Sequence, residues 1–281
     1  MRPKQWAKNI FIFAPLVFDR KLTDFNAVLV TILGAILFSL IASVVYIIND
    51  IADIEADRKH PTKQNRPIAA GKLAISTAWG AAIIILLVCF PLAILLSWQF
   101  AVICLIYLLL NLAYSKWLKH IVLLDIILIA SFYVIRVAAG VTLIEVQRFS
   151  PWIYIFTTFL ALLIGTGKRR AELAEFMEAA NAQRRVLDGY TLVFLDQLIT
   201  LASGMTIITY SLYTFSAPNL PDNHTMMLTI PFIIYSVFRY QYLLQVANIG
   251  GAPEDVVLSD RPLQTAIVLF SFAVLVIFYL F

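Results

Sequence analysis

Long apolar stretches alternate with short polar breaks along almost the whole chain. A helix needs roughly 17–25 mainly apolar residues to cross the hydrocarbon core of a bilayer, which is about 30 Å thick. Stretches of this kind, together with a shorter first segment, predict helices over residues 5–18, 25–57, 74–96, 98–115, 121–143, 151–167, 190–216, 226–247 and 263–281. We therefore expect an all-α polytopic membrane protein of about nine transmembrane helices, with residues 1–281 forming a single domain.

Local signals mark several helix ends. The sequence "LLSWQF" allows only a tight turn between the third and fourth segments. Turn-forming residues fill "SAPNLPDN" (216–223) and "GGAPED" (250–255), which predicts loops there. Asp260 followed by Pro262 has the pattern of an N-cap and a first-turn proline, so we expect the last helix to begin at this point.

The composition agrees with a chain that is mostly solvated by lipid. The protein is 61% hydrophobic and 14% charged, with a mean hydropathy of +0.87, whereas a soluble domain is roughly 45–50% apolar and about 25% charged. No pattern of a removable signal peptide is seen. Cys89 and Cys104 both lie in apolar runs, which predicts small core residues and not metal ligands or a disulfide.

The positions of the positive charges predict the orientation in the membrane. If the N-terminus is placed inside, all but four of the 21 Lys and Arg residues fall in inside loops or at inside helix ends. Arg20, Lys21 and Arg148 fall on the other side, and Arg136 lies within a helix. Cytoplasmic segments carry such an excess of positive charge. We expect an integral protein of the cytoplasmic membrane with a cytoplasmic N-terminus.

The second apolar segment ends in an acidic cluster, "NDIADIEAD" (49–57), on the predicted cytoplasmic side. At about 100° per residue, Asp53, Asp57 and Asp50 fall within roughly a quarter turn of Asn49, and Glu55 falls on the opposite side. Like charges on one helix face repel, and acidic residues at a helix C-terminus oppose the helix dipole. This face therefore predicts a bound cation, and its oxygen atoms suit Mg²⁺.

A basic loop, "DRKHPTKQNRPIAAGKL" (57–73), follows the acidic face directly. Carboxylates for a metal next to Lys and Arg for phosphate oxygens form the combination that a metal–diphosphate site needs. Lys63 and Arg66 are the candidates for the phosphates of a donor substrate. A helix end that is acidic and merely solvated is the alternative to such a site.

The acidic motif resembles the N-D-x-x-D-x-x-x-D motif of the UbiA superfamily of intramembrane prenyltransferases. The additional stretches "RPKQWAKN" (2–9), "YSKWLK" (114–119), "GKRRAEL" (167–173) and "PEDVVLSDRPL" (253–263) are similar to one branch, the decaprenyl-phosphate phosphoribosyltransferases. Many members of the superfamily carry a second Asp-rich motif in the loop after the sixth helix. Here that loop reads "GKRRAELAEFMEAANAQRRVLDGY", which departs from the pattern and weakens the prediction of aromatic prenylation.

The resemblance implies Mg²⁺-dependent transfer of 5-phosphoribose from 5-phosphoribosyl 1-diphosphate to a polyprenyl phosphate, with release of diphosphate at the cytoplasmic face. Mg²⁺ would be held by Asn49, Asp50, Asp53 and Asp57, whose three aspartates are also the predicted catalytic residues. The implied partners are the two substrates and the bilayer. No nucleic-acid partner is expected, and homo-oligomer formation, chain length of the acceptor and downstream pathway stay open.

Four further groups of residues are candidates for substrate binding, each with a simpler alternative. Lys8 would reach the pocket or extend to the membrane surface, and Tyr46 would contact the ribose or pack. In the loop after the sixth helix, Lys168, Arg169 and Glu172 would clasp the 5-phosphate and the ribose hydroxyls or anchor the inside loop. Arg136 lies in mid-membrane, where arginine is costly and usually functional. It would hold the acceptor phosphate or pair with Asp125 or Asp196.

Two other functions compete with phosphoribosyl transfer. A superfamily enzyme that moves a prenyl group from an allylic diphosphate to an aromatic or lipid acceptor would share the metal site, but it predicts a second carboxylate–Mg²⁺ cluster after the sixth helix. A transporter or assembly scaffold would favour charges near the midplane and inverted repeats. In this chain the polar groups crowd the predicted cytoplasmic end, which favours an enzyme.

Overall fold

The structure is a computed structural model that describes residues 3–59, 63–146, 150–178, 189–218, 220–221, 223–247 and 253–280. Within this part, eight helices are long and apolar enough to cross a membrane. They are α2 (Phe25–Ala52), α4 (Ile75–Leu96), α5 (Trp98–Lys116), α6 (Leu124–Val141), α7 (Pro151–Glu178), α8 (Leu192–Ser216), α9 (Ile230–Gln245) with the preceding η5 (Thr225–Thr229), and α11 (Arg261–Leu280). The prediction of an all-α protein with multiple membrane spans is confirmed.

The first predicted segment has a different form from the other eight. It is a 3₁₀ helix, η1 (Pro3–Phe13), followed by the short α1 (Ala14–Phe18). Three short helices were not predicted from the sequence: η2 (Lys63–Asn65), η3 (Leu118–His120) and α10 (Pro253–Ser259). The start of α10 overlaps the predicted loop 250–255, so that prediction is wrong from Pro253 onward. A further short helix, α3 (Ile54–Lys59), begins within the second predicted segment.

The backbone divides into two compact units. The first contains Met1–Leu16, Leu22–Lys116 and Arg136–Glu145, and the second contains Val17–Lys21, Trp117–Ile135 and Val146–Phe281. Helix α6 therefore begins in the second unit and ends in the first. The single domain over residues 1–281 stays a prediction, and the two units are described separately below.

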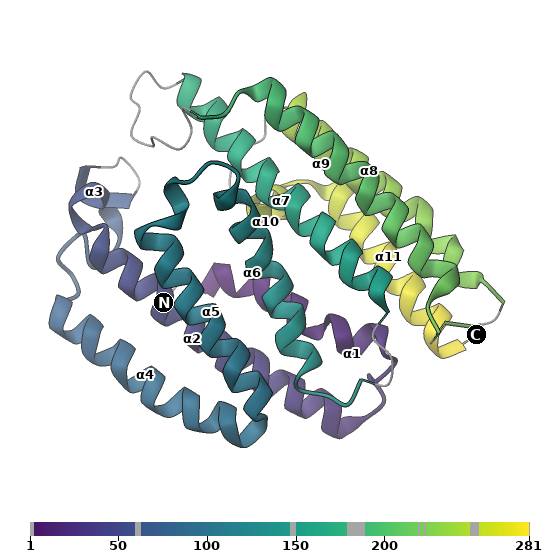
Figure 1. The fold of residues 1–281 in the computed structure, drawn as a ribbon, viewed down its shortest axis with the longest axis horizontal. Helices are drawn as coiled ribbons and strands as arrows, with labels where there is room; N and C mark the ends of the chain where they lie inside the picture. Colours follow the sequence, from purple (N-terminus) through teal and green to yellow (C-terminus); the bar gives the residue numbers. More distant parts are fainter. Residues whose placement is uncertain are drawn as a thin grey trace. The chain divides into compact units, whose positions relative to one another are not determined.

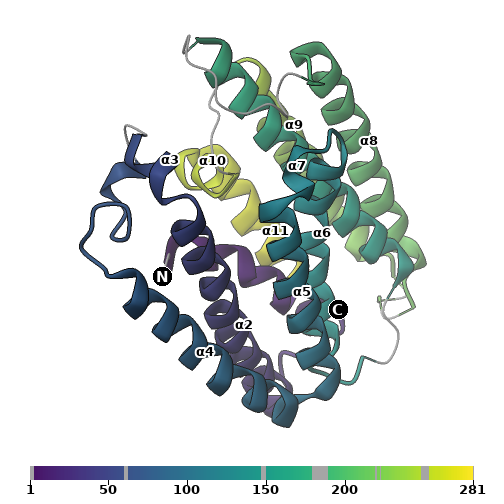
Figure 2. The ribbon, with the colours of Figure 1, turned by 60° about the vertical axis from the view of Figure 1, so that its left-hand side comes forward.

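In the first unit, α2 packs against η1, α4 and α5 (Figures 1 and 2). Asp24 caps α2, because its carboxylate accepts hydrogen bonds from the backbone N–H groups of Asn26 and Ala27. Helices α4 and α5 are separated by Ser97 alone, as the tight turn predicted. The outer face of α4 carries strongly exposed residues such as Leu87 (70%), which lipid covers in a membrane-spanning helix.

The second predicted segment is not one continuous helix. It divides at Asp53 (φ −99°, ψ 12°), where α2 ends and α3 begins, so the expectation of one helix over 25–57 is wrong in this detail. The helical hydrogen bonds nevertheless continue, since Asp53 N donates to Asn49 O at 2.9 Å and Asp57 N donates to Asp53 O at 2.8 Å. Carboxylates in the last turn oppose the helix dipole, and this weakens the helix at that point.

In the second unit, α7 packs along α8, while α9 contacts both α8 and α11 (Figures 1 and 2). The predicted start of the last helix is confirmed. The Asp260 carboxylate accepts a hydrogen bond from Leu263 N at 2.8 Å, and α11 begins at Arg261. Asp260 also pairs with Arg239 of α9 at 2.8 Å, which ties the start of α11 to its neighbour.

The segment after the sixth predicted helix is another point of difference. The sequence predicts a loop from residue 167, but α7 continues to Glu178. Lys168, Arg169 and Glu172 therefore lie on a helix and not in a loop. The reason is that "GKRRAELAEFME" contains strong helix formers, whose propensity continues the helix after the apolar run ends.

Candidate active site

The acidic face at the end of α2 carries the first set of predicted site residues. Asp57 is 4% exposed, and the side chain of Asp50 is 14% exposed. Asn49 and Asp53 are half-buried, whereas Glu55 is exposed, in agreement with its predicted position on the other side of the helix. Carboxylates this poorly hydrated need positive charge close by.

Arg66 of the basic loop supplies such a charge. Its Nη1 donates to Asp57 Oδ2 at 2.5 Å and lies 3.3 Å from Asp50 Oδ1. The structure therefore brings the acidic face and the basic loop together, as the sequence predicts. The side chain of Lys63, the other basic candidate of this loop, lies outside the described part of the structure.

The basic loop is held against α2 by packing and by a second arginine. Ile68 is 6% exposed and lies in a core cluster with Val44 and Ile47 of α2. Arg58 donates from Nε to the carbonyl of Ala69 at 3.1 Å. Gly71 has a φ of +71°, which a residue with a side chain adopts only with strain. These contacts fix the position of Arg66 beside the carboxylates.

The oxygen atoms of this face fit a hard cation. Asn49 Oδ1 is buried and has no hydrogen-bond partner, so this oxygen is available as a ligand of a cation. Asp50, Asp53 and Asp57 supply carboxylate oxygens, which Mg²⁺ prefers. Among the described residues, no three His, Cys, Asp or Glu side chains form a metal cluster. In this structure the guanidinium of Arg66 bridges two of the four oxygen-bearing side chains.

Toward the membrane interior, α2 continues the polar face with side chains three or four residues apart. Tyr46 is half-buried one turn before Asp50. Next come Ser43, which accepts a hydrogen bond from Trp6 Nε1 at 3.1 Å, and Ser39, which accepts one from Asn9 Nδ2 at 2.7 Å. Both donors belong to η1, which also carries Lys8, a half-buried residue. The sequence analysis missed these serines, although their spacing was visible.

Arg136 lies near the end of α6 and is 3% exposed. Its Nε donates to Asn9 Oδ1 at 2.8 Å, and its Nη2 donates to Tyr107 OH at 3.1 Å. The guanidinium carbon also lies 5.7 Å from the ring centre of Phe38 and 5.1 Å from that of Tyr107. Arg136 therefore contacts η1, α2 and α5, and its guanidinium adds cation–π interactions with Phe38 of α2 and Tyr107 of α5.

In the second unit, Arg169 is 1% exposed and lies in a network of charged and polar groups. Its Nε donates to Asp125 Oδ2 at 2.5 Å, and its Nη1 is paired with the Glu172 carboxylate. Tyr190 OH donates to Asp125 Oδ1 at 2.5 Å and accepts a hydrogen bond from Leu123 N at 2.6 Å. Burial, followed by the hydrogen bond to Asp125, raises the pKa of Tyr190 above its usual value.

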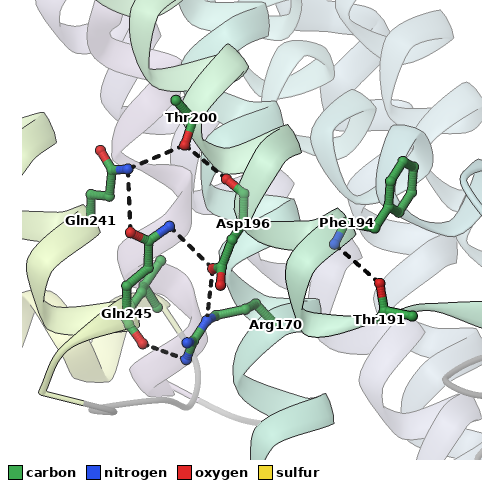
Figure 3. Close-up of polar contacts among 8 residues, drawn as sticks. Arg170, Thr191, Phe194, Asp196, Thr200, Gln241 and Gln245 are labelled. Atoms are coloured by element: carbon green, nitrogen blue, oxygen red, sulfur yellow. Dashed lines mark hydrogen bonds and ion pairs between the residues drawn. The ribbon is translucent and has the colours of Figure 1, made fainter.

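Arg170, the neighbour of Arg169, ties three helices together (Figure 3). It donates to Asp196 of α8 at 3.0 Å and to the carbonyl of Leu244 in α9 at 2.6 Å. Gln245 Nε2 donates to the same Asp196 oxygen at 3.1 Å. The two acidic residues that the sequence offered as partners of Arg136 thus have arginine partners on α7: Asp125 pairs with Arg169, and Asp196 pairs with Arg170.

The predicted residues divide between the units. The first unit holds Lys8, Tyr46, Arg136, Arg66 and the acidic face, and the second holds Lys168, Arg169 and Glu172. Lys168 and Glu172 are half-buried, whereas the burial and the two carboxylate partners of Arg169 leave it little surface for a substrate. Sequence reasoning missed the roles of Asn9, Tyr107 and Tyr190, because a neutral polar residue shows its partner only when the helices are packed.

The sequence of this chain is similar to those of several phosphoribosyltransferases. The chain is 34% identical over 268 residues to the decaprenyl-phosphate phosphoribosyltransferase of Mycobacterium tuberculosis, covering 94% of this chain and 88% of the relative. It is 31% identical to the enzyme of the same name from Corynebacterium glutamicum, covering 100% of this chain and 86% of the relative.

The fold has a similar counterpart among solved structures. A UbiA homologue from Archaeoglobus fulgidus, solved with DMAPP and Mg²⁺ bound, superimposes with a TM-score of 0.73 over 100% of this chain and 98% of that chain, at 18% identity. The sequence model of the UbiA prenyltransferase family matches residues 10–249. This chain, an integral membrane protein with multiple spans, is a transferase that belongs to the UbiA prenyltransferase family.

Proposed function

We propose that this protein transfers 5-phosphoribose from 5-phosphoribosyl 1-diphosphate to a polyprenyl phosphate of the decaprenyl type, in a Mg²⁺-dependent reaction that releases diphosphate. The observation that carries the proposal is the 31–34% identity, over 94–100% of this chain, to relatives named for this transfer. The pairing of an acidic face with a basic loop supports it, since the donor carries a diphosphate that needs both a metal and cationic side chains.

In the proposed site, Asn49, Asp50, Asp53 and Asp57 hold the metal. Bound Mg²⁺ neutralises charge on the leaving diphosphate. The unpartnered Asn49 Oδ1 and the poorly exposed Asp57 carboxylate are the observations that fit such an ion. We place this site at the cytoplasmic face, following the distribution of Lys and Arg.

Arg66 and Lys63 bind the donor phosphates. Both bonds of Arg66 to carboxylates use Nη1, so the Nε–Nη2 edge of the same guanidinium can take phosphate oxygens in the paired geometry that arginine favours. Tyr46, one turn from Asp50, faces the ribose. Lys8 binds a phosphate of one of the two substrates. Within the second unit, Arg169 holds Glu172, and Lys168 and Glu172 stay the predicted ligands of the 5-phosphate and the ribose hydroxyls.

The transfer breaks the bond between the anomeric carbon and the diphosphate oxygen, and it forms a bond between that carbon and an oxygen of the acceptor phosphate. Positive charge develops at the anomeric centre as the diphosphate leaves. The second ionisation of a phosphate monoester lies near pH 6, so the acceptor is already anionic and no residue must remove a proton. The protein contributes positioning and electrostatic stabilisation.

The competing function is prenyl transfer from an allylic diphosphate to an aromatic or lipid acceptor. That reaction predicts a second carboxylate cluster for Mg²⁺ after the sixth membrane-spanning helix. In the described part of this region, Glu172 is paired with Arg169, which also binds Asp125. Arg169 and Asp125 are 1% and 0% exposed, whereas Arg66 on the acidic face is 25% exposed. A fully buried arginine is harder to displace by a divalent cation than a partly exposed one, and this supports phosphoribosyl transfer.

The test is a substrate swap with purified protein and Mg²⁺. Labelled phosphoribosyl diphosphate with a polyprenyl phosphate should give a labelled lipid, and sealed vesicles should form it only when the predicted cytoplasmic face is exposed to the donor. Turnover of an allylic diphosphate with an aromatic acid, and none with phosphoribosyl diphosphate, would refute the proposal.

Two matched variants test the metal site. Asp53→Asn should lose about 10²-fold or more of the Mg²⁺-dependent rate, because a carboxylate ligand becomes a neutral amide. Glu55→Gln removes the same charge two residues away on the exposed side, and its rate should stay near that of the wild type. Full activity of Asp53→Asn would remove this residue from the site.

A further inference from the structure

The 3₁₀ helix η1 buries two residues that lie three positions apart. Asn9 (4% exposed) and Ile12 (0%) are buried, while Ile10 is 68% exposed. A 3₁₀ helix has 3.0 residues per turn, so residues three apart share one face. Trp6, Asn9 and Ile12 form this face, and the first two donate hydrogen bonds to Ser43 and Ser39 of α2.

The spacing of the two helices explains why η1 is a 3₁₀ helix over 11 residues. Three residues of a 3₁₀ helix advance about 6 Å, at about 2.0 Å each. Four residues of an α-helix also advance about 6 Å, at about 1.5 Å each. Trp6 and Asn9 therefore match Ser43 and Ser39 in register, with the two chains running in opposite directions. An α-helical η1 would advance only about 4.5 Å over three residues and would lose one bond.

Arg136 fixes this register through Asn9. The Asn9 amide donates to Ser39 on one side and accepts from Arg136 Nε on the other. One helical turn further along α6, Gly140 approaches η1 so closely that an added Cβ would lie 2.1 Å from the carbonyl oxygen of Ile12. The end of α6 therefore holds η1 at two points, Asn9 and Ile12.

The same geometry separates Arg136 from the acidic face. Its guanidinium lies over Phe38, which is 12 residues from Asp50 and hence about 18 Å away along α2. A phosphate that reacts next to a metal on Asp50 must approach the reacting carbon to about 3 Å. Arg136 is too far along the helix to hold that phosphate, so we look for its role in η1.

We propose that Arg136 is a positioning residue, which locks the register of η1 on α2 and thereby presents Lys8 to a substrate phosphate. This proposal rests on the proposed function, because it assumes that Lys8 binds a phosphate of one of the two substrates. Lys8 precedes Asn9, and a slip of one residue in a 3₁₀ helix would turn it by about 120°. In register, Lys8 lies about 14 Å from Asp50 along α2. It therefore suits a phosphate that the metal does not hold, either the 5-phosphate of the donor or the acceptor phosphate.

A double-mutant cycle between Lys8→Ala and Arg136→Gln tests whether Arg136 acts through Lys8. Each single variant should lower kcat/KM about tenfold or more, and the double variant should be within about twofold of Lys8→Ala, because both remove the same interaction. A raised KM for the donor would assign Lys8 to the 5-phosphate, and a raised KM for the polyprenyl phosphate would assign it to the acceptor. Arg136→Lys should not rescue, since lysine cannot donate to Asn9 and Tyr107 in the planar geometry of arginine.

Arg170→Gln is the matched control. Arg170 is also a buried arginine with side-chain and carbonyl partners (Figure 3), but these belong to the second unit. The fold-loss of kcat/KM in the double variant Lys8→Ala/Arg170→Gln should equal the product of the losses in the two single variants. If the losses of kcat/KM caused by Arg136→Gln and Lys8→Ala also multiply in the double variant, the positioning role is refuted.

A second measurement does not depend on turnover. Lys8→Cys is labelled with a charged methanethiosulfonate reagent, for which the native Cys89 and Cys104 are too buried to compete. Arg136→Gln should change the labelling rate several-fold. So should the milder Ser39→Ala, which keeps helix propensity and removes only the acceptor for Asn9. Unchanged rates in both would refute the positioning role, whereas failure of phosphoribosyl transfer in the wild type would refute only the proposed function.

Discussion

Arg169 and Asp125 form a buried ion pair between α7 and α6, with Nε and Oδ2 2.5 Å apart and side-chain exposures of 1% and 0%. Removing one partner of a buried pair leaves an uncompensated charge. Asp125→Asn should therefore lower the free energy of unfolding by about 3–5 kcal/mol. The measurement is thermal or denaturant-induced unfolding of the purified protein in detergent.

The control for this prediction is Asp196→Asn. Asp196 pairs with Arg170, the neighbour of Arg169 on α7, but has a side-chain exposure of 34%. A pair that is partly solvated contributes about 1 kcal/mol or less. Equal losses in the two variants would contradict a special role for the Arg169–Asp125 pair.

Gly140 and Gly80 make a second matched comparison. A Cβ at Gly140 would clash with the Ile12 carbonyl at 2.1 Å, whereas a Cβ at Gly80 meets nothing within 4 Å. Gly140→Ala should cost about 1–3 kcal/mol through overpacking. Gly80→Ala should be neutral or stabilise by about 0.5–1 kcal/mol, because alanine is the better helix former. Unfolding curves of the two variants decide the matter, and a neutral Gly140→Ala would argue against the close contact between α6 and η1.

Arg66→Gln tests the link between the acidic face and the basic loop. Loss of a charged, paired hydrogen bond to phosphate should raise the KM for the donor about tenfold or more, while the KM for the polyprenyl phosphate should change little. Lys72→Gln removes the same charge from an exposed residue of the same basic loop. A similar rise of the donor KM in both variants would mean that the general charge of the loop matters and not the position of Arg66.

The Asp260–Arg239 pair predicts a pH dependence of stability. Hydrogen bonding from Arg239 holds the pKa of Asp260 below its ordinary value of 3.8. The stabilisation is therefore complete above about pH 4 and is lost as the pH falls through the lowered pKa. Thermal unfolding from pH 7 to pH 3 should show a steeper fall for the wild type than for Asp260→Asn. Equal pH dependence in the two proteins would show that protonation of Asp260 does not change the free energy of unfolding.

Much of the fold was predictable because its signals are local. The length of each apolar run decides whether it can cross a bilayer, and a single residue such as Asp260 marks a helix start through bonds to its own neighbours. The proximity of Arg66 to Asp50 and Asp57 was also predictable, since only a short loop separates them in the chain. The residues that form these features lie close together in the sequence. Composition and spacing are therefore enough to predict them.

The partners of Arg136 and Arg169 were decided only by the tertiary structure. The sequence offered Asp125 and Asp196 to Arg136, yet these residues pair with Arg169 and Arg170, because helix packing and not chain order determines which buried groups meet.

The form of η1 has the same origin. Its residues alone predict a short helix, and its 3₁₀ geometry matches the rise of α2, since three residues of η1 meet four of α2 at the two hydrogen bonds. The sequence by itself thus determined which stretches form the membrane helices and where the acidic motif lies, although the ends of α2 and α7 differ from the prediction. Packing between distant segments decided the register of η1 and brought Arg136, Arg169 and Arg170 to their partners on other helices.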